Sequence, residues 1–444
     1  MAEYAPQQNH PRPREAVRRA SIHTLGCRLN QSESGILMDL LRRGGYELVP
    51  FGEHADLGIV HTCTVTREAD AKSRQFIRSF IRKNPDAFVA VIGCYAETGH
   101  EALGEIEGID LICGNQEKMN VIEFVAHGKN ETPLIIREPI QRDDFTIAFA
   151  EGAPTERRTN LKIQDGCNFM CSYCAVPFAR GRSRSRAIDN LLDEARVLVV
   201  RGAKEIVLTG VNLGCYAFDG LTVADVADRL DAIPGLRRIR ISSIEPMTIP
   251  DMLIERMADP GHALAPYLHI PLQSGSDRVL QLMNRRYTQT EFTDFIEAAY
   301  RRVPDLCIGT DIMVGMPGET EADFNETRAV LRDMPFAYAH VFKYSERPGT
   351  ASERLPDKVD PKTANRRSAA IRRLSEAKRR GFYERFLGRT VEVLFEQEQD
   401  GWWEGYTGNY VRVAARSSNR MRNKFGRVTL EGVRGDIAMG TIHD

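Results

Sequence analysis

The feature that most restricts this chain is a group of three cysteines within eight residues. The segment LKIQDGCNFMCSYCAVPFARGRSRSR carries them in the spacing C-x3-C-x2-C, as Cys167, Cys171 and Cys174. Thiolates are the usual protein ligands of iron-sulfur clusters, and three of them on one short loop can surround a single inorganic centre. The spacing therefore predicts a metal centre on this loop.

A structural zinc site is the alternative interpretation of closely spaced cysteines. A closed zinc site takes four protein ligands, whereas this loop supplies three. The nearest other candidate ligands lie far along the chain, at Cys113, His127, Cys215 and His262. A triplet without a local fourth ligand instead favours an iron-sulfur cluster with one iron left open, and an open iron can chelate a small molecule.

Three further cysteines each follow a short apolar segment that is typical of a strand. Cys27 follows SIHTLG, Cys63 follows LGIVHT and Cys94 follows FVAVIG. The carboxyl ends of parallel strands meet at one edge of a sheet, where open α/β folds bind ligands. A single cysteine there is most often a small buried hydrophobe, but three equivalent ones with polar neighbours indicate a second metal centre. The other cysteines, interpreted as structural, are Cys113, Cys215 and Cys307.

The alternation of strands and helices predicts an α/β protein with three folded parts. Residues 1–19 form a tail without periodicity, and residues 20–138 repeat strand and helix as a parallel sheet with helices on its faces requires. Residues 139–159 lose this rhythm and are interpreted as a linker. Residues 160–387 contain six strand-helix units, which fit a partial (β/α)6 barrel, and end in a long basic helix. Residues 388–444 are rich in short strands and turns, as in a small antiparallel β-barrel of the OB-like type.

Charge and composition exclude several classes of protein. The 444 residues carry 60 basic and 61 acidic side chains, so bulk positive charge cannot hold nucleic acid and any such contact must be local. The sequence shows neither an apolar run long enough for a membrane span nor a secretory signal. Nine cysteines in so long a chain are too few for a disulfide scaffold, so a cytoplasmic protein with metal or redox chemistry is expected.

Taken together, the motifs resemble those of the radical S-adenosylmethionine (SAM) methylthiotransferases. The resemblance covers residues 20–444 and includes TLGCRLNQSES, HTCTVTREADAKSRQFIR, VIGCYAE, the cysteine triplet, LTGVNLGCY, RISSIEP, HIPLQSGSDRVLQLMNRRYT, TDIMVGMPGET and FKYSERPGTAS. Within the family, TCTVTREADAKSRQ and GWWEGYTGNYVRV look most like the branch that acts on N6-threonylcarbamoyladenosine at tRNA position 37. That branch implies the addition of a methylthio group to C2 of the adenine.

The resemblance also implies SAM and two 4Fe-4S clusters as cofactors. It makes the triplet the ligands of a radical-generating cluster, and Cys27, Cys63 and Cys94 the ligands of an auxiliary cluster that handles the sulfur. One SAM molecule would methylate that sulfur, and a second would provide the radical that removes the C2 hydrogen. A C2–H bond offers neither an acidic proton nor a leaving group, so acid-base chemistry alone cannot replace it.

Candidate contacts to SAM lie beside the triplet or at strand ends. They are Tyr173, Gly210, Ser243, Glu245 and Gly315. Serine and glutamate at the end of a strand can bind the ribose hydroxyls or the amino group of the methionine moiety, and glycines allow the backbone to approach a nucleotide. For each of them an ordinary turn at the strand end is the alternative.

Two basic segments are candidates for tRNA contact. The C-terminal part resembles the TRAM barrel that many tRNA-modifying enzymes carry, and its segment VRVAARSSNRMRNKFGR holds six basic residues and no acid, after aromatics that can stack on bases. The loop after the triplet adds Arg180, Arg182, Arg184 and Arg186, which can contact phosphates. The predicted RNA contacts are Arg182, Arg184, Trp403, Tyr410, Arg412, Arg422 and Lys424. Against this, aromatics at strand spacing are more often core residues, and the basic helix after residue 361 is usually a solvated face.

Two alternatives remain beside this function. A sister methylthiotransferase would act on N6-isopentenyladenosine of tRNA or on an aspartate of ribosomal protein S12. A protein of another class, a non-catalytic iron-sulfur sensor that binds RNA, would not cleave SAM. The favoured interpretation implies tRNA as substrate, a flavodoxin- or ferredoxin-type electron donor, a sulfur source that the sequence leaves unknown, and no membrane.

Overall fold

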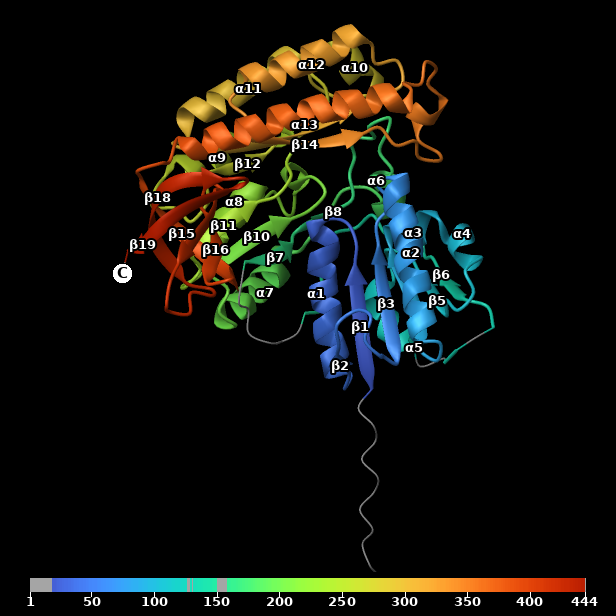
Figure 1. The fold of residues 1–444 in the computed structure, drawn as a ribbon. Coiled ribbons are helices and arrows are strands. Elements are labelled where there is room, and N and C mark those ends of the chain that lie inside the picture. Colours follow the sequence, from blue (N-terminus) through green and yellow to red (C-terminus); the bar gives the residue numbers. More distant parts are fainter. Residues whose placement is uncertain (1–17, 126–127, 130, 150–157, 444) are drawn as a thin grey trace, which may run out of the picture.

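The protein consists of three packed parts, seen in a computed structural model that describes residues 18–125, 128–129, 131–149 and 158–443 (Figure 1). They are a parallel sheet with helices, a partial parallel barrel and a closed β-barrel. Almost all of the predicted tail, and residues 150–157 of the predicted linker, lie outside the described residues. Among the helices in the described ranges, none is both long and apolar enough to cross a membrane.

The N-terminal part is a parallel sheet in the order β2-β1-β3-β4-β5-β6. Its strands are β1 (Arg19–Thr24), β2 (Glu47–Leu48), β3 (Leu57–Thr62), β4 (Phe88–Gly93), β5 (Leu111–Cys113) and β6 (Leu134–Ile136). Its helices are α1 (Arg28–Arg43), α2 (Arg67–Lys83), α3 (Cys94–Thr98), α4 (His100–Gly104) and α5 (Val121–Val125). The predicted parallel sheet is confirmed. The strands β3 and β4 are buried along their whole length, as central strands covered on both faces must be.

Local sequence explains where the helices of this part begin. Thr66 caps α2, because its hydroxyl accepts a hydrogen bond from the Ala69 backbone N–H at 3.1 Å. The strand β4 passes into α3 through Gly93, whose φ of +96° suits glycine alone. As a result Cys94 is the first residue of α3. In the same part of the chain, Cys27 directly precedes α1. Two of the predicted metal ligands thus lie at helix N-termini.

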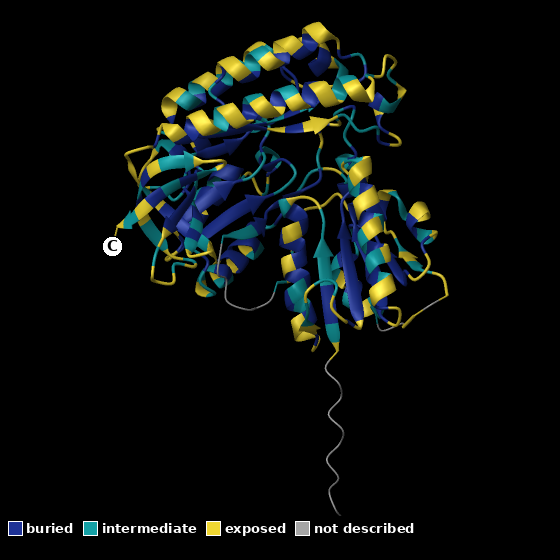
Figure 2. Ribbon diagram, viewed as in Figure 1, coloured by how far each residue is buried: buried dark blue, intermediate teal, exposed yellow. Residues whose placement is uncertain are grey.

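The central part is an open barrel of six parallel strands, as predicted. They are β7 (Thr159–Lys162), β10 (Glu205–Thr209), β11 (Arg238–Ile241), β12 (Tyr267–His269), β13 (Cys307–Val314) and β14 (Tyr338–Lys343). They form the sheets β7-β10-β11 and β12-β13-β14, and a parallel bridge between Ser243 and His269 joins the two. The connecting helices are α7 (Ile188–Val200), α8 (Val223–Asp231), α9 (Asp251–Ala258), α10 (Asp277–Leu282), α11 (Gln289–Arg302) and α12 (Glu321–Asp333). Their buried faces turn towards the strands and their exposed faces away from them (Figure 2).

The C-terminal part is a closed barrel in the order β15-β16-β17-β19-β18, and the long helix α13 (Pro361–Glu384) leads into it. Its strands are β15 (Thr390–Gln399), β16 (Trp402–Thr407), β17 (Arg412–Arg416), β18 (Phe425–Arg434) and β19 (Ile437–His443). The expected barrel is confirmed, with one correction to its strand directions. The strands β17 and β19 pair in parallel, because β18, which separates them in the sequence, runs antiparallel to β19 on its other side, so the barrel is not wholly antiparallel.

A buried carboxylate fastens the C-terminal barrel to the central part. Glu205 accepts hydrogen bonds from Arg240 at 2.8 Å and from Arg238 at 3.1 Å. The same two arginines donate to backbone carbonyls at the end of β16 and just after it, among them those of Tyr406 at 3.1 Å and Gly408 at 2.8 Å. The position of the C-terminal barrel over the strand ends is therefore fixed by charge-assisted hydrogen bonds.

Candidate active site

The cysteine triplet lies on a loop that two short strands hold in place. The strands β8 (Gln164–Asp165) and β9 (Arg184–Ser185) pair on either side of it, and α6 (Val176–Arg180) follows the last cysteine. The loop turns at Gly166, which has a φ of +71° and where an added Cβ would lie 2.0 Å from the carbonyl oxygen of Arg182. Only glycine fits there. The Cys167 backbone N–H then donates to the Gly181 carbonyl at 3.1 Å, which closes the loop.

The three thiols lie close together and are suited to ligate a metal centre. Backbone N–H groups donate to two of the sulfurs, from Phe169 to Cys167 and from Val176 to Cys174, both at 3.4 Å. Burial is the main cause that raises the pKa of Cys174 to about 12, and charge repulsion from the Cys171 and Cys167 thiols adds to it. A bound metal offsets the free energy needed to ionise the buried thiol, because it binds the thiolate and displaces the proton.

Arg285 connects the triplet with the predicted SAM contact Glu245. One terminal nitrogen of Arg285 donates to the Cys171 sulfur at 3.2 Å, and the other donates to the Glu245 carboxylate. Burial raises the pKa of Glu245, and the charge of Arg285 offsets only part of that effect. Arg285 is not among the residues predicted from the sequence, although it belongs to the segment HIPLQSGSDRVLQLMNRRYT.

The other predicted SAM contacts fall into two groups. Gly210 and Ser243, at the ends of β10 and β11, line a cavity that is described below. Tyr173 instead packs against an apolar cluster around Met283. Gly315 forms a turn in which its backbone N–H donates to the Glu319 carboxylate at 2.5 Å, and it does not line that cavity.

The structure brings Cys27, Cys63 and Cys94 to the same edge of the N-terminal sheet. Gly26 approaches Cys63 so closely that an added Cβ would lie 2.9 Å from the Cys63 sulfur. Burial is the main cause that raises the pKa of Cys63 to about 12, and the Cys94 and Cys27 thiols raise it further. These three thiols form a second group that is suited to ligate a metal. Cys113, at the end of the next strand, is fully buried among apolar side chains instead.

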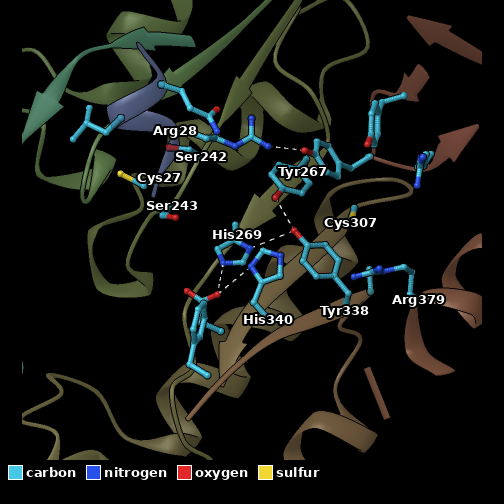
Figure 3. A pocket seen from close by; sticks show the side chains of 18 of the residues that line it. Cys27, Arg28, Ser242, Ser243, Tyr267, His269, Cys307, Tyr338, His340 and Arg379 are labelled. Atoms are coloured by element: carbon cyan, nitrogen blue, oxygen red, sulfur yellow. Dashed lines mark hydrogen bonds and ion pairs between the residues drawn. The ribbon is translucent and has the colours of Figure 1, made fainter. Parts of the chain in front are cut away.

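A cavity of about 660 Å³ opens between the N-terminal sheet, the strand ends of the central barrel, α13 and the C-terminal barrel (Figure 3). Cys27 and Cys63 belong to its lining, as do residues of the C-terminal barrel such as Arg412. All three parts of the chain therefore contribute to a single cavity. The cysteines of the triplet are not among the residues that line it.

Aromatic rings form one wall of this cavity. The rings of Tyr267 and Tyr410 stack with centroids 4.7 Å apart, and the Tyr267 hydroxyl is 2.7 Å from that of Tyr338. Arg28, the residue after Cys27, donates to the Tyr410 hydroxyl at 2.5 Å (Figure 3). This contact joins the N-terminal sheet to the C-terminal barrel. A flat wall of this kind suits stacking on a nucleobase.

Beside this wall lies a group of polar residues that the analysis of the sequence did not single out. Asp311 accepts a hydrogen bond from His269 at 2.9 Å, and His340 lies 3.4 Å from the same carboxylate oxygen. Burial alone would raise the pKa of Asp311, but the two imidazoles, His269 first, outweigh it and hold this pKa well below its ordinary value. All three residues belong to neighbouring strands: His269 ends β12, and Asp311 and His340 are paired in register within β13 and β14.

Two of the arginines after the triplet are buried, which corrects the prediction that they contact phosphates. Arg180 pairs with Glu33 and Asp165, and Arg186 pairs with Glu194. Their guanidinium groups neutralise acids inside the protein and cannot reach RNA. The side chain of Arg184 is only 10% exposed and lies 3.7 Å from Asp165. Arg182 is exposed and remains available.

The residues of the C-terminal barrel that are predicted to contact RNA differ in burial and in surroundings. Trp403 is buried in the barrel core, so its ring cannot stack on a base, which corrects that prediction. Tyr410 faces the cavity described above, and Arg412 pairs with Glu404 and Asp436 at its rim. Arg422 and Lys424, which are also predicted to contact RNA, are exposed at the surface.

Comparisons with known proteins agree with this geometry. Residues 161–331 match the radical SAM superfamily, and residues 19–114 match a family described as uncharacterized protein family UPF0004. A partial parallel barrel with a cysteine triplet at its first strand thus defines a radical SAM protein. The fold resembles that of the radical SAM methyltransferase TsrM from Kitasatospora setae, with TM-scores of 0.51 and 0.52 in two structures that share 13% and 14% of residues and cover 73–74% of this chain and 73–75% of TsrM.

Similar curated proteins extend the match to nearly the whole chain. The "Threonylcarbamoyladenosine tRNA methylthiotransferase MtaB" of Bacillus subtilis (strain 168) is 36% identical over 92% of this chain and 93% of its own. The protein of that name from Aquifex aeolicus (strain VF5) is 34% identical over 87% and 95%. The "tRNA-2-methylthio-N(6)-dimethylallyladenosine synthase" of Nitratidesulfovibrio vulgaris (strain Hildenborough) is 35% identical over 91% and 94%. The chain belongs to the radical SAM methylthiotransferase family, and its cofactors are SAM and two 4Fe-4S clusters.

Proposed function

We propose that this protein inserts a methylthio group at C2 of N6-threonylcarbamoyladenosine at tRNA position 37. The observation that carries this proposal is the cavity of Figure 3, where Cys27 and Cys63 face an aromatic wall that the central and C-terminal barrels share. Relatives whose printed names state this activity match the chain over most of its length. The cavity can hold one base between a sulfur-handling site and stacking rings.

Each group of cysteines has its own role in this proposal. The triplet holds the radical-generating cluster, and Cys27, Cys63 and Cys94 hold the auxiliary cluster. When bound, the clusters and SAM supply the methyl group, the sulfur site and the one-electron chemistry that an unactivated C2–H bond requires. The protein itself supplies position: the rings of Tyr267 and Tyr410 orient the base, and the walls of the cavity shield part of it from water.

The three parts of the chain divide the work. Residues 20–138 carry the auxiliary site, residues 160–387 carry the radical site and residues 388–444 hold the tRNA, with 139–159 as the linker. The exposed basic residues Arg182, Arg422 and Lys424 contact tRNA phosphates. A flavodoxin- or ferredoxin-type protein delivers electrons, and the reaction takes place in the cytoplasm, where the enzyme meets tRNA.

The decisive experiment is mass spectrometry of tRNA nucleosides from cells with and without this gene. Loss of 2-methylthio-N6-threonylcarbamoyladenosine, together with accumulation of the unthiolated nucleoside, is the expected result. If the methylthio derivative of isopentenyladenosine disappears instead, the substrate assignment is wrong while the family stands. If no tRNA nucleoside changes, the aspartate of ribosomal protein S12 becomes the first substrate to test, and failure of the reduced protein to cleave SAM would favour a sensor.

A further inference from the structure

Among the basic residues of α13, Arg379 differs from its neighbours because it faces the cavity. Arg366 and Arg367 pair with acids at the start of α12, Lys378 donates to backbone carbonyls, and Arg380 pairs with Glu384. Arg379 is half-buried and lines the cavity, with its guanidinium carbon 5.4 Å from the centre of the Tyr338 ring. Within the described residues it has no carboxylate partner.

The acidic side chains that line the same cavity already have basic partners. Asp311 accepts a hydrogen bond from His269 and lies 3.4 Å from His340, and Asp436 pairs with Arg412 at 3.0 Å. The lining has two other arginines: Arg412 makes that pair with Asp436, and Arg28 uses its guanidinium to donate to the Tyr410 hydroxyl. Arg379 therefore differs from both, because within the described residues its guanidinium N–H groups make no hydrogen bond, and it is partly shielded from water. Such a site attracts an anionic group of a ligand.

Arg379 and Cys27 lie on opposite sides of the cavity. Figure 3 shows Cys27 and Ser243 on one side of the drawn space and Arg379 on the other, with Tyr267 and Tyr338 between them. If a base stacked on these rings with its C2 edge towards Cys27, a substituent on its N6 atom would extend away from the sugar, into the part of the cavity that Arg379 lines. The ring of Tyr338 holds the guanidinium in place by a cation-π contact before the ligand arrives.

We propose that Arg379 is the specificity-determining residue that binds the carboxylate of the threonylcarbamoyl side chain. This inference rests on the proposed function, because that substrate carries a carboxylate and an isopentenyl group carries no charge. Arginine forms bidentate hydrogen bonds to carboxylates, and bonds of this kind to a charged group change affinity by about 10- to 100-fold. Arg379 thus separates substrates by a charge that the aromatic wall cannot detect.

The test uses the reconstituted full-length enzyme and two anticodon stem-loop RNAs. One RNA carries N6-threonylcarbamoyladenosine at position 37, and the other carries the same nucleoside with its carboxylate converted to a neutral carboxamide. The wild-type enzyme should show a KM for the carboxylate RNA that is about tenfold or more below its KM for the carboxamide RNA. R379Q should raise the first KM to the level of the second, leave the second unchanged, and leave kcat nearly unchanged for both.

Two variants control for indirect effects. R373Q alters an exposed arginine of the same helix that is not part of the cavity lining, and it should leave both KM values unchanged. R379K should keep part of the preference, since it retains the charge and loses the bidentate geometry. The unchanged reaction of R379Q with the carboxamide RNA shows that the variant is folded and active.

The outcomes separate this inference from the proposed function. If the wild-type enzyme methylthiolates the carboxylate RNA and R379Q keeps the full preference, the role of Arg379 is wrong while the function stands. If the wild-type enzyme has no preference between the two RNAs, the inference is likewise wrong. If the wild-type enzyme modifies neither RNA but modifies an isopentenyladenosine RNA, both the proposed function and the inference are wrong.

Discussion

Arg180 forms a bidentate ion pair with Glu33, with hydrogen bonds from Nη1 to Oε1 at 3.2 Å and from Nη2 to Oε2 at 3.0 Å. Arg180 ends the helix that follows Cys174, and Glu33 lies in the helix that follows Cys27. Both side chains are buried, together with Asp165 and two lysines that complete the ion-pair network, Lys118 and Lys162. The network fixes the two groups of cysteines relative to each other across the junction of the first two parts.

Arg180→Ala should destabilise this junction strongly. The substitution leaves Glu33 and Asp165 buried with fewer positive partners, and breaking a buried ion pair in this way costs roughly 3–5 kcal/mol. Urea unfolding followed by far-UV circular dichroism measures the loss, and iron analysis of the purified protein shows whether the clusters are retained. Arg182→Ala alters an exposed residue on the same loop and should change stability by less than about 0.5 kcal/mol. Equal stability of the two variants would contradict the role given to Arg180.

The network also shows which parts of the site a sequence can predict. Cys27, Cys63 and Cys94 could be predicted because each follows an apolar strand, and parallel strands bring their ends to one edge whatever surrounds them. Arg180 could not, because it directly precedes GRSRSR, which has the composition of an exposed basic loop, and its partner Glu33 lies 147 residues earlier. Long-range pairing of charges leaves no local periodicity in the sequence.

The C-terminal barrel shows the same limit for aromatic residues. Trp402 and Trp403 are adjacent in β16, so their side chains point to opposite faces of the strand. Alternation predicts that one of them is buried, but not which one. In the structure Trp403 faces the barrel core, while Trp402 is partly exposed beneath the guanidinium of Arg416 at 4.9 Å. The cavity wall of Tyr267, Tyr338 and Tyr410 likewise needs the fold, because two parts of the chain contribute to it.

Substitutions in the two groups of cysteines should abolish different activities. Cys171→Ala removes a ligand of the triplet, so the reduced enzyme should no longer cleave SAM. Cys63→Ala leaves the triplet intact, so cleavage of SAM without product should continue while sulfur insertion stops. High-performance liquid chromatography of 5'-deoxyadenosine and of the modified nucleoside measures both activities. Cys113→Ala is the control, because that cysteine belongs to the apolar core. Loss of both activities in Cys63→Ala, with the triplet cluster still bound, would contradict this division.

The anchor of the C-terminal barrel should weaken in acid. Burial raises the pKa of Glu205, but Arg240 and then Arg238 outweigh it, so its pKa falls from 4.5 to about 2 in the folded protein. Because the folded pKa is the lower one, the carboxylate stabilises the protein fully above pH 4.5, and that contribution of about 3 kcal/mol is lost as the pH falls towards 2. Both tryptophans lie in β16, so their fluorescence reports unfolding of this barrel.

Glu205→Gln tests this assignment. The variant should be less stable near neutral pH, and its free energy of unfolding should depend less on pH between 4.5 and 2 than that of the wild-type protein. Glu376→Gln, which alters an exposed acid of α13, should leave the pH dependence unchanged. A wild-type dependence that persists in Glu205→Gln would assign it to other carboxylates.

The exposed basic face of the C-terminal barrel should set the salt dependence of tRNA binding. Arg416, Lys424 and Arg427 are exposed on the segment from β17 to β18. Replacing all three by glutamine should reduce the slope of log K against log salt concentration by about 2, since each lost contact to a single strand removes about 0.7. Fluorescence anisotropy with a labelled anticodon stem-loop measures this slope.

A matched triple variant of Arg78, Arg82 and Lys83, exposed on α2 across the molecule in Figure 1, should leave the slope unchanged. Because these contacts position the RNA without reading the base, kcat at saturating RNA should stay the same in both variants. An equal change of slope in the α2 variant would mean that the tRNA is not held mainly by the C-terminal barrel.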